Sequence, residues 1–211
     1  MSRDDARARI LMAAGPVFAE RGYQAATVRQ ICQEADVNVA AVNYYFGDKE
    51  RLYVETVKHA HRPPAAELPE ALQWPEGTPT RTKLRDYLRG MMTRITSEQA
   101  PWQRQLMMRE MLNPTVACRE LVRTYIRVRF EQLLEILDEL LPAEMPDYRR
   151  HQVAFSVIGQ VLHYHVSGEV VTLLVGEEER TAHYDTEALV EHITQFTMAA
   201  LGADSLSGTY R

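Results

Sequence analysis

The chain has 211 residues, of which 45% are hydrophobic and 25% are charged, and its formal net charge is −5. This hydrophobic content is sufficient for a folded core and excludes wholesale disorder. Residues 1–62 carry nine Lys/Arg and eight Asp/Glu, so the acidic excess lies after them. The two cysteines, Cys32 and Cys118, lack metal-ligand spacing, and no 18-residue apolar run is present. We therefore expect a cytoplasmic protein without a membrane span.

The first predicted helix covers residues 3–21, with Gly22 suited to its end. Its apolar stripe consists of Ile10, Leu11, Ala14, Val17 and Phe18. Gly15-Pro16 interrupts the sequence of the helix, because proline removes one helical hydrogen bond. The stripe continues through this pair, so we expect a bend and not a break.

The stretch from Thr27 to Lys49 predicts two short helices, at about 28–35 and 39–45, joined by a tight turn. Thr27 is a good N-cap, because its hydroxyl can accept a hydrogen bond from the first turn. Either Asp36 or Asn38 can adopt a left-handed or capping conformation at modest cost. Two short helices with such a joint are typical of a helix-turn-helix.

In a helix-turn-helix, small residues at the start of the second helix let its backbone lie close to DNA. We expect Val42 and Phe46 to face the core and Asn43 and Tyr45 to project outward. Asparagine can bind a base edge, and tyrosine hydroxyls commonly bind phosphates. The predicted DNA-binding residues are Thr27, Arg29, Asn38, Ala40, Ala41, Asn43, Tyr44, Tyr45 and Lys49. The alternative is an ordinary helical hairpin within an all-α core.

The longer run AAGPVFAERGYQAATVRQICQEADVNVAAVNYYFGDKERLYVETV, residues 13–57, resembles the DNA-binding domain of TetR-family transcriptional regulators. The resemblance departs at Cys32, Asp36 and Asn38, where the family usually has Ala, Gly and Ser. It implies a homodimeric, ligand-responsive regulator, most often a repressor, that binds a palindromic double-stranded DNA operator. It also implies that the predicted fourth helix, residues 48–61, transmits the ligand signal from the body.

Five of the ten prolines fall in residues 63–80, which we interpret as a linker with Trp74 packed on the body. The remaining sequence predicts helices at about 81–98, 102–112, 116–141, 147–174 and 186–201, with Glu177–Glu179 in a solvated loop. The predicted fold is all-α. An N-terminal helix-turn-helix domain (1–62) and the linker (63–80) precede a larger helical domain for ligand binding and dimerisation (81–211).

The segments RQLMMREMLNPT, TYIRVRFEQLLEIL, AFSVIGQVLHYHV and HITQFTMAAL resemble the C-terminal domain of CecR/YbiH-type TetR regulators. In TetR-like proteins the last two long helices of each subunit form the dimer interface. The expected interface residues are Phe155, Ser156, Gly159, Gln160, Ile193 and Phe196. The alternative is that these two helices are ordinary core helices.

Methionines are clustered on two of the predicted helices, and flexible, polarizable side chains suit a pocket for apolar molecules. The expected pocket residues for an unidentified small-molecule effector are Met91, Met92, Trp102, Met107, Met111, Tyr125, Arg129 and His163. A methionine-rich core explains the same pattern equally well.

We expect no cofactor, no metal and no catalytic residues, since phosphate-loop, nucleophile-elbow and metalloprotease motifs are absent. Two rival interpretations are a helical interaction protein without DNA binding and a helical enzyme using His163 or Glu110.

Overall fold

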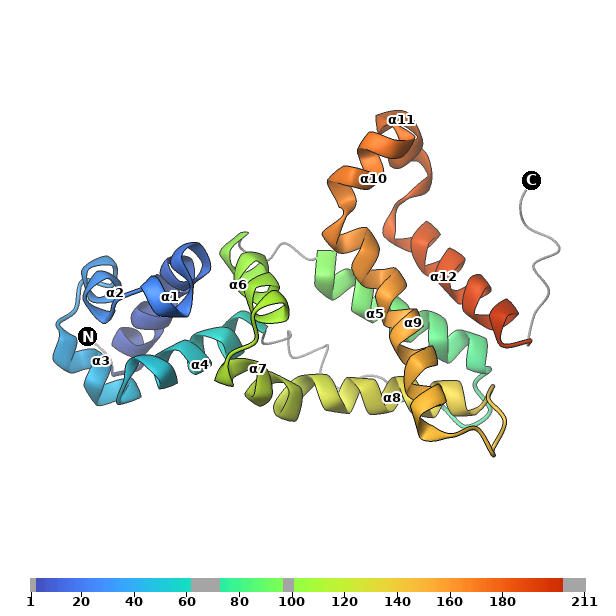
Figure 1. Cartoon of the computed structure of the whole chain (residues 1–211), viewed down its shortest axis with the longest axis horizontal. Helices are drawn as coiled ribbons and strands as arrows, with labels where there is room; N and C mark the ends of the chain where they lie inside the picture. Colours follow the sequence, from blue (N-terminus) through green and yellow to red (C-terminus); the bar gives the residue numbers. More distant parts are fainter. Residues whose placement is uncertain (1–2, 62–72, 97–100, 203–211) are drawn as a thin grey trace. The chain divides into compact units, whose positions relative to one another are not determined.

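The computed structural model describes residues 3–61, 73–96 and 101–202, and every regular element in these ranges is helical (Figure 1). The chain divides into two compact units. Unit 1 comprises Met1–Pro63 and Glu98–Arg127, and unit 2 comprises Pro64–Ser97 and Val128–Arg211. No helix in the described ranges is long and apolar enough to cross a membrane.

Unit 1 begins with four helices: α1 (Arg3–Ala25), α2 (Val28–Glu34), α3 (Val39–Phe46) and α4 (Lys49–His61). These bounds agree closely with the predicted ones. α1 continues through Pro16, and its backbone leaves helical geometry at Gly22, with φ of 74° and ψ of 172°. Glycine suits this point because side chains disfavour positive φ.

Three further helical segments complete unit 1: α6 (Pro101–Leu112), α7 (Val116–Leu121) and the π-helix η3 (Val122–Ile126). α6 packs against α1 and α4, and α7 packs against α4. By compactness, α6, α7 and η3 group with the N-terminal helices, although they follow residue 81, where the predicted C-terminal domain begins. The reason is packing between distant segments, which local sequence patterns do not report.

Unit 2 contains α5 (Thr80–Thr96), α8 (Arg127–Asp138), α9 (Asp147–Val166), α10 (Gly168–Val175), α11 (Glu177–His183) and α12 (Thr186–Ala200). Its apolar core forms where α5 packs against α9 and α12. Trp74 packs on this core as expected, and its indole Nε1 donates to Asp86 Oδ2 at 3.3 Å. The predicted linker is described only from residue 73 onward, so its first part lies outside the described residues.

Three predicted boundaries were wrong. The helix expected at 116–141 contains the π-helical stretch and ends at Asp138. The helix expected at 147–174 is interrupted at Ser167, whose ψ of 18° separates α9 from α10. The loop expected at Glu177–Glu179 is the first turn of α11, where three carboxylates complement the partial positive charge of a helix N-terminus.

Candidate nucleic-acid interface

Side-chain caps fix the joint between α2 and α3. Thr27 Oγ1 accepts from Gln30 N at 3.3 Å, and Gln30 Oε1 accepts from Thr27 N at 3.1 Å, which forms a capping box. Asn38 Oδ1 caps α3 by accepting from Ala41 N at 2.9 Å. Asp36 between them has φ of 50°, so the expected left-handed residue is present. Residues at the start of each of the two helices therefore determine the geometry of this joint.

One face of this pair of helices is buried and holds it on α1 and α4. Ile31 and Cys32 of α2 and Val42 and Phe46 of α3 belong to the core of unit 1. Burial in this apolar core also raises the pKa of the Cys32 thiol. A 3.6-residue repeat that buries one stripe leaves the opposite face to solvent. The predicted inward direction of Val42 and Phe46 is confirmed.

The solvent-facing side of α3 carries three of the nine predicted DNA-binding residues. Ala40, Asn43 and Tyr44 are exposed, and Tyr44 keeps 62% of its surface accessible. Arg29 on α2 is also exposed, as are the two cap residues Thr27 and Asn38, while Ala41 is half-buried. Ala40, Asn43 and Tyr44 are spaced at i, i+3 and i+4, so they share one solvent-facing side of α3.

Tyr45 differs from its prediction as an outward-facing residue. It is half-buried and packs against the core of unit 1. Its ring centroid lies 5.0 Å from that of Tyr44 and 6.4 Å from that of Phe46. Tyr44 is the more exposed member of the pair. Position 45 follows 42 by three residues, so its side chain lies at the border of the buried stripe.

Lys49 at the start of α4 is already engaged within unit 1. Its Nζ donates to the Gln24 carbonyl oxygen at 3.1 Å and lies 4.7 Å from the centroid of the Tyr23 ring. An ammonium has three N–H donors, so donors remain for a phosphate oxygen. The contact holds the start of α4 next to the end of α1.

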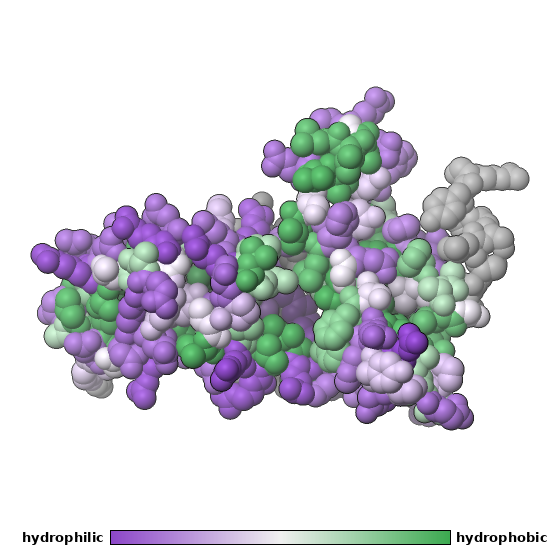
Figure 2. All heavy atoms as spheres, viewed as in Figure 1, coloured by the Kyte–Doolittle hydropathy of each residue, from purple (hydrophilic) through white to green (hydrophobic). Residues whose placement is uncertain are grey.

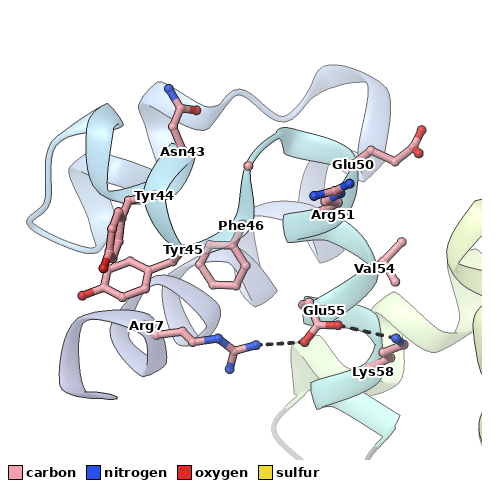
Figure 3. A pocket seen from close by; sticks show the side chains of 11 residues that line it. Arg7, Asn43, Tyr44, Tyr45, Phe46, Glu50, Arg51, Val54, Glu55 and Lys58 are labelled. Atoms are coloured by element: carbon pink, nitrogen blue, oxygen red, sulfur yellow. Dashed lines mark hydrogen bonds and ion pairs between the residues drawn. The ribbon is translucent and has the colours of Figure 1, made fainter. Parts of the chain in front are cut away.

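Arg51 is a surface cation that our sequence analysis missed. It is exposed in the first turn of α4, and its backbone N donates to Asp48 Oδ1 at 2.8 Å. Its side chain, with those of Arg7, Asn43 and Lys58, lines a pocket of about 510 Å³ (Figure 3). The spacing to Lys49 did not indicate this role, because residues two apart point to different sides of a helix.

A network of buried polar side chains connects α4 with α6 and with the turn that follows α6. Glu110 of α6 is 2% exposed, and its Oε1 accepts from the Tyr53 hydroxyl of α4 at 2.5 Å. Its Oε2 accepts from Thr115 N at 3.1 Å, and the Thr115 hydroxyl lies 3.0 Å from both oxygens. Burial, followed by the bond to Glu110, raises the pKa of Tyr53 well above its usual value, so this hydroxyl stays a donor. The network ties α4 to the turn between α6 and α7.

A second tie joins α6 to α1. The Arg109 guanidinium donates from Nε to the Ala19 carbonyl and from Nη2 to the Glu20 carbonyl, both at 2.6 Å. These carbonyls lie two and three residues before the helical break at Gly22. One turn of α6 thus supplies two neighbouring residues, Arg109 and Glu110, that hold α1 and α4.

The eight predicted pocket residues are divided between the two units. In unit 1, Trp102, Met107 and Tyr125 pack on the core, and Met111 is 51% exposed. In unit 2, Met92 is buried, Met91 and Arg129 are half-buried, and His163 is exposed. For Trp102, Met107 and Met92 the burial favours the methionine-rich-core alternative. A hollow of about 740 Å³, formed by the loop before α9 and the first turns of α9 and lined by Pro142, Met145, Arg149 and Ser156 among others, includes none of the eight.

The predicted dimer residues lie on α9 and α12 of unit 2. Phe155, Ser156 and Gly159 are exposed on α9, with Gln160 half-buried beside them. Phe196 on α12 is 49% exposed, whereas Ile193 is completely buried. Ile193 is a core residue of its own unit, because α12 turns that side toward α5 and α9. Its side chain is therefore out of reach of a partner subunit.

The described residues contain no group of three His, Cys, Asp or Glu side chains that could hold a metal ion. What the geometry offers is a capped helix-turn-helix with an exposed recognition surface, the arrangement found in sequence-reading DNA-binding proteins.

Comparison with known proteins agrees with this geometry. Residues 10–56 match the family of bacterial regulatory proteins of the TetR type, and residues 80–201 match the C-terminal domain of the HTH-type transcriptional dual regulator CecR. The chain is 27% identical to that regulator from Shigella flexneri over 193 residues, covering 84% of this chain and 85% of the relative.

Solved structures show the same fold. HlyIIR, a hemolysin II transcriptional regulator, is 27% identical, with a TM-score of 0.60 over 92% of this chain and 99% of that one. A TetR-like transcriptional regulator from Rhodococcus sp. RHA1 has a TM-score of 0.59 at 16% identity, over 97% of this chain and 100% of that one. The chain is thus a helix-turn-helix transcriptional regulator. It belongs to the TetR family, and its C-terminal domain is of the CecR type.

Proposed function

We propose that this regulator is a homodimeric repressor that binds a pseudo-palindromic operator through α3 and releases it when a small molecule binds the C-terminal domain. The observation that carries the DNA-binding part is the exposed row Ala40, Asn43 and Tyr44 on a helix capped by Asn38. Small residues at the start of α3 allow close approach to the major groove, and Asn43 supplies a donor and an acceptor for a base edge. As a protein acting on chromosomal DNA, it would work in the cytoplasm.

The proposed dimer uses α9 and α12. TetR regulators typically act as dimers, and Phe155, Gly159 and Phe196 are solvent-facing in the single chain. A Cβ added at Gly159 would meet no atom within 4 Å, so nothing inside the chain requires glycine there. Glycine within a helix costs about 1 kcal/mol relative to alanine, and close approach of a partner helix would account for it. A two-fold dimer would place two α3 helices about 34–36 Å apart, one DNA turn.

The effector is proposed to bind in unit 2. Of the predicted pocket residues, Met91 and Arg129 stay candidates there, because both are half-buried. An effector of this kind must bind the DNA-free state more tightly than the DNA-bound state, since it can shift the equilibrium only by that difference. Loss of operator binding is therefore the appropriate screen for it.

A binding selection on a random duplex library at stated salt concentration tests the proposal. The expected result is an enriched inverted repeat whose half-sites are one helical turn apart. A folded dimer that enriches no sequence, even at low salt, would contradict it and favour the interaction-protein alternative. An enriched single half-site would retain the recognition surface and contradict the dimer.

A further inference from the structure

The hairpin formed by α10 and α11 is a separate feature of unit 2 (Figure 1). It follows α9 after Ser167 and turns at Gly176, whose φ of 88° suits glycine. Only one of its apolar residues is buried: Val171, at 6% exposure. At its end, Tyr184 packs on the core of unit 2, with its ring 6.2 Å from that of Tyr164. The hairpin is thus anchored at both ends.

The solvent-facing part of α10 exposes large apolar side chains. Leu173 and Leu174 are each 79% exposed, and Val170 is 54% exposed. Apolar atoms gather on this hairpin, with hydrophilic residues around them (Figure 2). Single exposed leucines are common, but adjacent ones on one helical face mark an interaction site. The hairpin therefore carries an apolar surface with no partner among the described residues of its own chain.

This surface continues the proposed dimer face of α9. The exposed positions Phe155, Gly159, His163, Val166, Val170 and Leu173/Leu174 follow one another at spacings of three or four residues. Such spacing keeps residues on one side of a helix. Ser167 N still bonds to His163 O, and Val171 N to Ser167 O, both at 2.8 Å, so near-helical bonding spans the interruption. We call these positions the α9–α10 stripe.

The charge pattern of the stripe favours a second copy of this chain as its occupant. The stripe contains no Asp, Glu, Lys or Arg, so a two-fold contact would bring no like charges together. Glu177, Glu178 and Glu179 follow directly on α11 and disfavour an anionic membrane or nucleic acid. A surface that is self-compatible and continuous with a dimer face fits a copy of itself.

We infer that the α10–α11 hairpin is an arm that packs its leucine surface on the second subunit and extends the dimer interface beyond α9 and α12. This inference rests on the proposed homodimer. It assigns to Val170, Leu173 and Leu174 a role in assembly that adds to the residues of the two long helices. Burying four leucines per dimer makes the arm a large contributor to dimer affinity.

Sedimentation equilibrium of the full chain tests the arm, using the double variant Leu173→Ser with Leu174→Ser. We expect its dimer dissociation constant to rise about 100-fold or more. Both side chains are exposed in the single chain, so the helical content and the cooperativity of unfolding should persist. The matched control is Leu112→Ser in unit 1, since Leu112 is 72% exposed and outside the stripe. It should leave the dissociation constant unchanged.

A second variant, Phe155→Ser with Phe196→Ser, separates the arm from the proposed function. If this variant dissociates while the leucine variant stays as dimeric as the parent, the proposed role of the arm is wrong and the proposed homodimer is retained. If the parent chain is itself monomeric at micromolar concentration, the homodimer and the arm both fail. Weakening by both variants, with the Leu112→Ser control unaffected, supports the arm.

Discussion

Units 1 and 2 hold their helices together by different means. Unit 1 buries polar groups: Glu110 lies inside it and accepts hydrogen bonds from α4 and from the α6–α7 turn. Unit 2 buries the hydroxyls of Thr194 and Thr197 but no charged side chain among its described residues, and it pairs its charges near the surface, as in Arg89–Glu187 and Lys83–Glu139. Buried networks fix one geometry, whereas exposed pairs contribute little and allow adjustment. The buried carboxylate network is thus the feature that distinguishes unit 1 from unit 2.

The largest expected effect comes from removing the centre of the buried network. Glu110→Ala leaves the Tyr53 hydroxyl and the Thr115 N–H without an acceptor, and should lower the free energy of unfolding by about 3 kcal/mol or more. Chemical denaturation measures it. The matched change in unit 2, Glu187→Ala, removes an exposed ion pair and should have a far smaller effect. Equal effects of the two variants would remove the distinction between the units.

Glycines offer a second comparison. A Cβ on Gly15 would lie 2.5 Å from the Trp102 ring, so Gly15→Ala should destabilise the chain by about 1–3 kcal/mol through overpacking. Gly90 in α5 has no atom within 4 Å of such a Cβ, and Gly90→Ala should stabilise by up to about 1 kcal/mol. Thermal unfolding reports both. A neutral Gly15→Ala would mean that Trp102 moves aside easily.

A third substitution separates the scaffold of unit 1 from its surface. Asn43→Ala changes an exposed residue, so its effect should fall on DNA binding and leave the melting temperature unchanged. Specific affinity should drop about tenfold, with less change for unrelated duplexes, as expected for a lost base contact. Fluorescence anisotropy at fixed salt measures it. Uniform weakening on all duplexes would instead assign Asn43 to a phosphate.

The smallest effect concerns a surface carboxylate of unit 2. Hydrogen bonds from Lys83 and Thr80 lower the pKa of Glu139 below its ordinary value of about 4.5. Its stabilising contribution is therefore present above about pH 4.5 and is lost as the pH falls through the lowered folded-state pKa. The stability difference between the parent and Glu139→Gln should be below about 1 kcal/mol at neutral pH and should shrink on acidification. A difference that grows with acid would contradict this assignment.

Local signals predicted the recognition element well. Thr27 and Asn38 cap their helices as their residue types suggest, and Asp36 adopts the left-handed turn. The break at Ser167 was missed because apolar residues continue at helical spacing on both sides of it. α11 was missed because a run of three glutamates suggests solvent exposure, which is correct, without excluding a helix.

Interactions between distant segments could not be predicted from local patterns. Trp102 was interpreted as a pocket residue because its methionine neighbours suit a pocket, yet its ring covers Gly15 of α1. The same contact accounts for Gly15, for which the sequence offered no reason. Glu110 likewise gave no sign that it would bond to Tyr53, 57 residues earlier.

The ties made by Arg109 and Glu110 also have a consequence for biosynthesis. Residues 3–61 leave the ribosome well before α6, so the ends of α1 and the hydroxyl of Tyr53 await partners that are made later. Domains form during synthesis only when their contacts have emerged. The DNA-reading head of a nascent chain would therefore reach its final form only after residue 115 has been exposed, and a chain stopped at residue 62 would lack it.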